Sequence, residues 1–94
     1  PYVYMDVTRY TRFFVFYGKS RLLESARLFA QGKIKEAHRM VCSLEIQALD
    51  LRDVYYATAP SPLAERVGSE SYRMAHQLRT IIETKAAQES VSLR

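Results

Sequence analysis

The sequence predicts an all-α protein, a small helical bundle built on a helical hairpin with one long central helix at about residues 34–57. The first observation behind this is an apolar stripe whose members lie alternately three and four residues apart, the spacing of one helix face. The stripe consists of Ile34, Ala37, Val41, Leu44, Ala48, Leu51 and Tyr55. The second and third observations are the breaks on either side, at Gly32 and at Pro60–Pro62. Between the breaks there is no Gly or Pro, so the helix should be about 36 Å long at about 1.5 Å per residue.

The N-terminal segment is expected to be a short aromatic helix preceded by an extended lead-in at residues 1–5. Asp6 is a suitable N-cap and Gly18 a suitable residue for the turn that ends the helix. Aromatic and β-branched residues also favour strands, which leaves a hairpin through residues 8–11 as the alternative. That hairpin would require a turn pair, and Arg9-Tyr10 is not one.

The next segment forms the first arm of the hairpin, at about residues 20–31. Ser20 caps it, and Gly32 supplies the left-handed conformation that ends a helix at low cost. The run from Ala26 to Ala37 resembles the helix–Gly–helix junction of tetratricopeptide-type scaffolds, which implies paired helices and a docking surface. No second repeat is visible, and such arrays need several repeats.

The C-terminal helix begins after Pro60, with Ser61 as its N-cap and Pro62 in its first position. Gly68 is expected to break or bend it before an apolar stripe continues to about residue 85. Residues 86–94 lose the stripe, so they are expected to form a flexible tail.

Size and charge limit the classes of protein to which the chain can belong. Its 94 residues make a single helical domain, residues 1–94, with a formal net charge of +4. Residues 1–39 hold eight Lys and Arg against three acids, whereas residues 40–94 hold six against seven. The N-terminal half could therefore face an anionic partner.

No pattern in the chain indicates catalysis, a cofactor or a metal centre, so we expect a protein that is not an enzyme. The single cysteine, Cys42, allows no internal disulfide, and with His38 it offers only two metal ligands. The longest apolar run has five residues, far fewer than the roughly 20 of a membrane span. We expect an intracellular, cytoplasmic protein; an organelle stays possible because the chain does not begin with Met.

The long helix carries a second apolar stripe, formed by Cys42, Ile46, Leu49 and Tyr56. A helix with two apolar faces must be covered on both. Either another helix of the same chain covers this side, or these four residues form the interface with another protein chain, in a homo-oligomer or a larger assembly.

The function expected from these patterns is that of a non-catalytic adaptor or assembly subunit that acts through protein–protein contacts. The alternative is an accessory protein that binds RNA or DNA through its basic N-terminal half. Arg9, Arg12, Lys19 and Arg21 would then contact phosphates, beside aromatic side chains that could stack on unpaired bases.

Overall fold

The computed structural model describes the backbone of residues 2–55 and 61–94 and the side chains of residues 11–53 and 61–94. These ranges contain three α-helices, α1 (Tyr2–Ala30), α2 (Ile34–Asp50) and α4 (Pro62–Gln88). A π-helical segment, η1 (Leu51–Tyr55), prolongs α2. The described residues include no strand, which confirms the all-α class.

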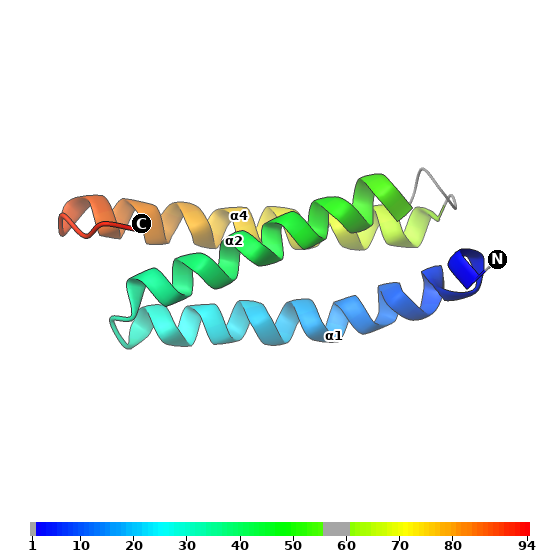
Figure 1. Ribbon diagram of the computed structural model, residues 1–94, viewed down its shortest axis with the longest axis horizontal. Coiled ribbons are helices and arrows are strands. Elements are labelled where there is room, and N and C mark those ends of the chain that lie inside the picture. Colours follow the sequence, from blue (N-terminus) through cyan, green and yellow to red (C-terminus); the bar gives the residue numbers. More distant parts are fainter. Residues whose placement is uncertain (1, 56–60) are drawn as a thin grey trace.

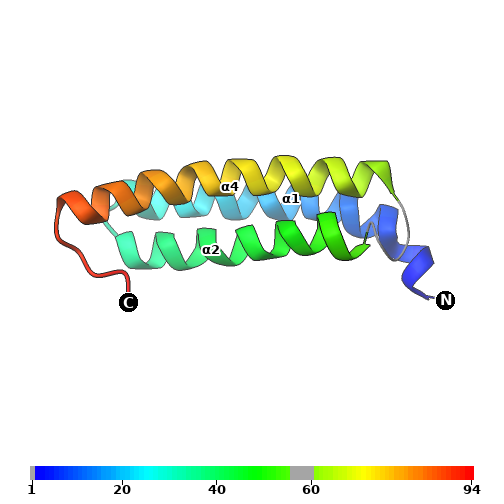
Figure 2. The same cartoon turned by 90° about the horizontal axis from the view of Figure 1, so that it is seen from above.

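The helices lie side by side in a bundle 48 Å long and 19 Å across (Figure 1). Helices α1 and α4 run in the same direction and α2 runs in the opposite one, so the chain goes up, down and up (Figure 2). None of the described helices combines the length with the apolar character that a bilayer crossing requires.

The N-terminal half is one continuous helix, where the sequence suggested a lead-in and two helices. Helix α1 starts at Tyr2, so Asp6 does not cap it and residues 2–5 are not extended. Gly18 does not end it either, because the glycine is buried against Phe14 in the middle of the helix. The helix continues through it because one glycine inside a helix costs only about 1 kcal/mol.

The predicted hairpin between α1 and α2 is confirmed, and its turn has a complete set of hydrogen bonds. The Gly32 N–H donates to the Phe29 carbonyl at 3.0 Å and the Lys33 N–H to the Leu28 carbonyl at 2.9 Å. Gly32 has a φ of 82°, the left-handed conformation of a Schellman turn. A buried hydroxyl adds a tertiary contact, since Ser25 donates to the Ala37 carbonyl at 2.8 Å.

The core lies along α2, which packs against both other helices. The described part of the predicted stripe is buried, from Ile34 to Leu51, whereas Tyr55 lies outside the described side chains. Phe14 and Leu28 reach this core from α1, and Ala64, Ala75, Ile82 and Ala86 reach it from α4.

Helix α4 begins as predicted, with the Ala64 N–H donating to the Ser61 hydroxyl at 3.2 Å. It then passes through Gly68 without a break. A Cβ built on Gly68 would lie 2.7 Å from the Arg52 backbone nitrogen and 2.9 Å from the Ala48 carbonyl oxygen. Gly68 therefore allows the backbones of α4 and η1 to meet directly.

The last residues do not form the expected tail. Helix α4 extends to Gln88 and closes with a second Schellman turn, in which the Val91 N–H donates to the Ala86 carbonyl at 2.8 Å. Ser90 occupies its left-handed position with a φ of 54°. The chain then turns back, and Val91 and Leu93 pack against the core (Figure 1).

Candidate functional site

The most distinctive surface of the molecule is a shallow apolar groove between α1 and α4. Near the middle of α1 the groove contains a hollow of about 110 Å³ whose floor includes Gly18 and Leu44. A second hollow lies nearer the C-terminal ends of the same two helices, between Phe29 and Ile81. Among the side chains that the structure describes, no hydrogen bond or ion pair joins α1 to α4.

Each wall of the groove is a row of apolar side chains at seven-residue spacing. The rows are Val15, Leu22 and Phe29 on α1, and Val67, Met74 and Ile81 on α4. The two helices are parallel, and each residue of the α4 row lies 52 positions after the residue that faces it in the α1 row. The two rows therefore run in register. A seven-residue repeat keeps its side chains on one line of a helix that packs against a neighbour.

The groove remains partly open to solvent along its length. Met74 is 40% exposed and Ile81 55% exposed, and beside the α1 row Leu23 is 70% exposed. The other members of the two rows are half-buried. Polar side chains also line the two hollows, among them Glu70 in the first and Thr80 and Thr84 in the second.

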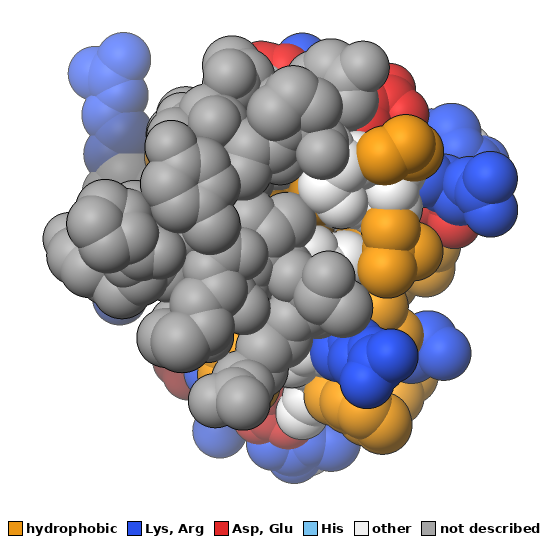
Figure 3. All heavy atoms as spheres, turned by 90° about the vertical axis from the view of Figure 1, so that its right-hand side faces the viewer, with side chains coloured by type: hydrophobic (Ala, Val, Ile, Leu, Met, Phe, Trp, Pro, Cys, Tyr) orange, Lys and Arg blue, Asp and Glu red, His pale blue; other side chains and the backbone are white. Residues whose placement is uncertain are grey.

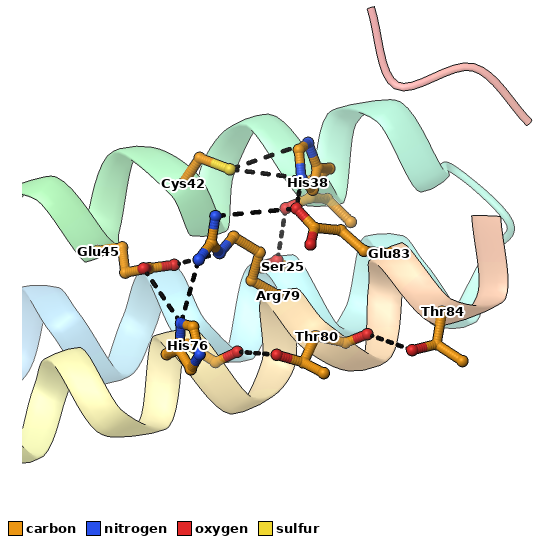
Figure 4. A network of polar contacts seen from close by, with 10 residues as sticks. Ser25, His38, Cys42, Glu45, His76, Arg79, Thr80, Glu83 and Thr84 are labelled. Carbon is orange, nitrogen blue, oxygen red and sulfur yellow. Dashed lines mark hydrogen bonds and ion pairs between the residues drawn. The ribbon is translucent and has the colours of Figure 1, made fainter. Parts of the chain in front are cut away.

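The opposite side of α4, where it packs against α2, is a closed and polar seam (Figure 4). Glu45 of α2 is buried and lies 2.7 Å from the Arg79 Nε of α4, as an ion pair. A second contact joins His38 Nε2 to Glu83 Oε2 at 2.7 Å. His76 Nδ1 lies 3.3 Å from Glu45 and 3.1 Å from Arg79 Nη2, and it can either donate to the first or accept from the second.

Cys42 lies at the edge of this seam, with its sulfur 3.5 Å from His38 Nε2. The two residues are four positions apart in the sequence, and the fold brings Glu83 to His38 from 45 positions away. Burial raises the pKa of the Cys42 thiol, whereas a nucleophilic cysteine requires a lowered pKa. No group of three or more His, Cys, Asp or Glu within the described residues could hold a metal ion.

The second stripe of the long helix does not form one continuous exposed face. Cys42 contacts the seam and Leu49 is half-buried, so Ile46 is the one strongly exposed member among those described, at 68%. Tyr56 lies outside the described residues. The role of these residues as a partner interface stays a prediction.

The residues of the nucleic-acid hypothesis lie on α1. Arg12 and Lys19 are exposed, and Arg21 lies over the Tyr17 ring at 5.6 Å from its centroid. The side chain of Arg9 lies outside the described set. Phe13 and Phe16 are 59% and 77% exposed, whereas Phe14 is buried in the core. Figure 3 shows the end of the bundle near the N-terminus, where apolar side chains reach the surface among Lys and Arg.

The groove was missed in the sequence because its two walls come from segments 52 residues apart. The signal that could have found it is the pair of seven-residue rows, each of which merges with the core stripe of its own helix. Comparison with protein-family models, with curated proteins and with solved structures finds no match for this chain.

Proposed function

We propose that this protein is a non-catalytic assembly subunit, and that it binds a helix of another protein in the groove between α1 and α4. The observation that carries the proposal is the pair of apolar rows in register, Val15–Leu22–Phe29 and Val67–Met74–Ile81, which remain partly exposed. An amphipathic helix that lies in an apolar groove is a common mode of peptide recognition.

The packing supports this choice of surface over the outer face of α2. Ile46 is as exposed as Leu23, but on its face Cys42 and Leu49 are half-buried, and the exposed neighbours Arg39 and Asp50 are charged. Single exposed apolar side chains are normal on protein surfaces. In the groove the exposed Met74 and Ile81 continue a line of half-buried apolar side chains.

The proposal is tested with a double variant, Met74→Glu with Ile81→Glu, and with Ile46→Glu as the matched control. All three side chains are exposed, so both proteins should fold with unchanged helicity in circular dichroism. Light scattering on a size-exclusion column and affinity capture measure association. We expect the double variant to lose the partners that the parent and the control both retain.

The opposite pattern contradicts the proposal. If Ile46→Glu abolishes association and the groove variant does not, then the stripe of Cys42, Ile46 and Leu49 is the interface and the groove is not.

Nucleic-acid binding is a second candidate function, favoured by the exposure of Phe13 and Phe16 beside Arg12 and Lys19. Exposed aromatic rings stack on unpaired bases, and cations between them contact phosphates. The double variant Arg12→Ala with Lys19→Ala should then weaken binding to single-stranded oligonucleotides and flatten its salt dependence. Unchanged affinity in that variant would exclude this use of α1.

A further inference from the structure

We propose that the occupant of the groove is a single amphipathic helix of another protein, about four turns long, with acidic side chains along the edge that faces α1. This inference rests on the proposed function and adds the chemistry of the partner.

The length of the occupant follows from the length of the walls. The α1 row extends from Val15 to Phe29, which is about 21 Å at about 1.5 Å per residue. The α4 row from Val67 to Ile81 has the same length and register. A helix of about 14 residues covers both, and its apolar residues need the same seven-residue spacing to stay over the groove.

The charge of the occupant follows from the two rims. On α1, Arg12 and Lys19 lie seven residues apart, both are exposed, and Lys19 lines the hollow near the middle of that helix. Neither cation has a hydrogen bond or an ion pair among the described residues. The rim of α4 carries Glu70 and the neutral Gln77, with the exposed Arg66 and Arg73 one row further out. The α1 rim is therefore the one that holds cations without an acid, and acidic residues on that edge of the partner complement it.

A second copy of this chain fits the groove less well. Each chain carries a net charge of +4, so two copies repel each other, whereas an acidic helix is attracted. Like charges at an interface oppose association.

The experiment uses two synthetic helical peptides of about 18 residues, each with Leu at the two core positions of every heptad. One carries Glu along one flank and Gln along the other; its counterpart carries Lys in place of Glu. Fluorescence anisotropy measures the binding of each to the full chain. We expect the Glu peptide to bind about tenfold more tightly at low salt, with the difference shrinking as salt rises.

Two double variants distinguish the residues that select the charge of the peptide from the residues that bind it. Arg12→Glu with Lys19→Glu should reverse the preference, so that the Lys peptide binds more tightly than the Glu peptide. Met74→Glu with Ile81→Glu should abolish binding of both peptides, and Ile46→Glu should leave both affinities unchanged.

Each contrary outcome has a distinct meaning. Equal affinity for the two peptides, or a preference that the Arg12 and Lys19 variant leaves unchanged, overturns the acidic partner and leaves the groove as the binding site. If neither peptide binds, and if the chain forms a dimer that the double variant Met74→Glu with Ile81→Glu dissociates, then the occupant of the groove is a second copy. An oligothymidylate that displaces the Glu peptide and binds more tightly overturns the protein partner. Peptide binding that survives in the groove variant overturns the proposed function as well.

Discussion

The two sides of α4 illustrate two ways in which one helix meets its neighbours. Toward α2, the contact is closed: buried Glu45 faces Arg79, and Gly68 lets the backbones touch. Toward α1, the contact is open, lined by apolar side chains of which Met74 and Ile81 remain exposed. The seam pairs opposite charges within the chain, although Glu45 Oε2 and Arg79 Nε lie 2.7 Å apart without forming a hydrogen bond. The groove leaves apolar area in water.

This difference indicates which contact fixes the alignment of the helices. Buried polar pairs impose one alignment of α2 on α4, because any other alignment would leave charges unpaired. An apolar groove imposes no such alignment by itself, and its exposed area is stabilised only when something covers it. The seam therefore favours one alignment of α2 on α4, and the groove is the surface that we propose for partner binding.

The sharpest contrast is expected between two adjacent residues of α4. Ile82 is fully buried and Ile81 is 55% exposed in the groove. Ile82→Ala should lower the free energy of unfolding by about 2–5 kcal/mol through loss of packing, and Ile81→Ala by less than about 1 kcal/mol. Urea denaturation measures both. Similar losses for the two variants would mean that the groove is already closed in the free chain.

The two interior glycines provide the next comparison. A Cβ at Gly68 would lie 2.7 Å from the Arg52 nitrogen, so Gly68→Ala must push α4 away from η1, at a cost of about 1–3 kcal/mol. At Gly18 a Cβ would meet Phe14 at 3.5 Å, an ordinary contact. Gly18→Ala should instead stabilise the helix by about 0.5–1 kcal/mol. Thermal melting should therefore shift in opposite directions, and shifts of the same sign would contradict the close approach at Gly68.

A buried ion pair and an exposed ion pair should contribute differently to the free energy of unfolding. Glu45→Gln removes the charge that faces Arg79 in the buried seam, which should cost about 1–2 kcal/mol of stability. The matched control is Glu24→Gln, which breaks an exposed pair with Arg27 on α1. That control should leave the urea midpoint unchanged, because solvent screens exposed pairs. Equal effects would show that burial of the seam contributes nothing.

The smallest effect concerns Cys42 at the edge of the seam. Burial raises the pKa of its thiol, so at pH 8 a smaller fraction is thiolate than in an unfolded chain. Alkylation by iodoacetamide should be slower in the folded protein than in urea, and it should accelerate as pH rises toward the raised pKa. A folded-state rate equal to the rate in urea would contradict the burial of the thiol.

The sequence predicted those parts of the fold that depend on local signals. The left-handed turn at Gly32 and the Ser61-Pro62 start of α4 are where the sequence placed them, because both depend on backbone preferences of a few residues. Gly18 and Gly68 were misinterpreted because glycine does not always end a helix: Gly18 is tolerated inside α1, and Gly68 permits close packing. Only the tertiary contacts distinguish the two roles.

The surfaces were harder to predict than the helices. The second stripe of α2 was interpreted as one apolar face, but Cys42 contacts His38, which in turn contacts Glu83, 45 positions further along the chain. The groove likewise joins rows 52 residues apart. A single sequence predicts which face of each helix is apolar, but it does not predict which faces pack against one another.

The most direct test of the central claim is methyl NMR of the free chain and of the chain with the Glu peptide. The methyl groups of Met74 and Ile81 report on the groove, and that of Ile46 reports on the outer face of α2. We predict that the Met74 and Ile81 signals shift on binding while the Ile46 signal stays in place. Shifts at Ile46, with Met74 and Ile81 unchanged, would show that the partner binds the outer face of α2 and that the groove is not the functional surface.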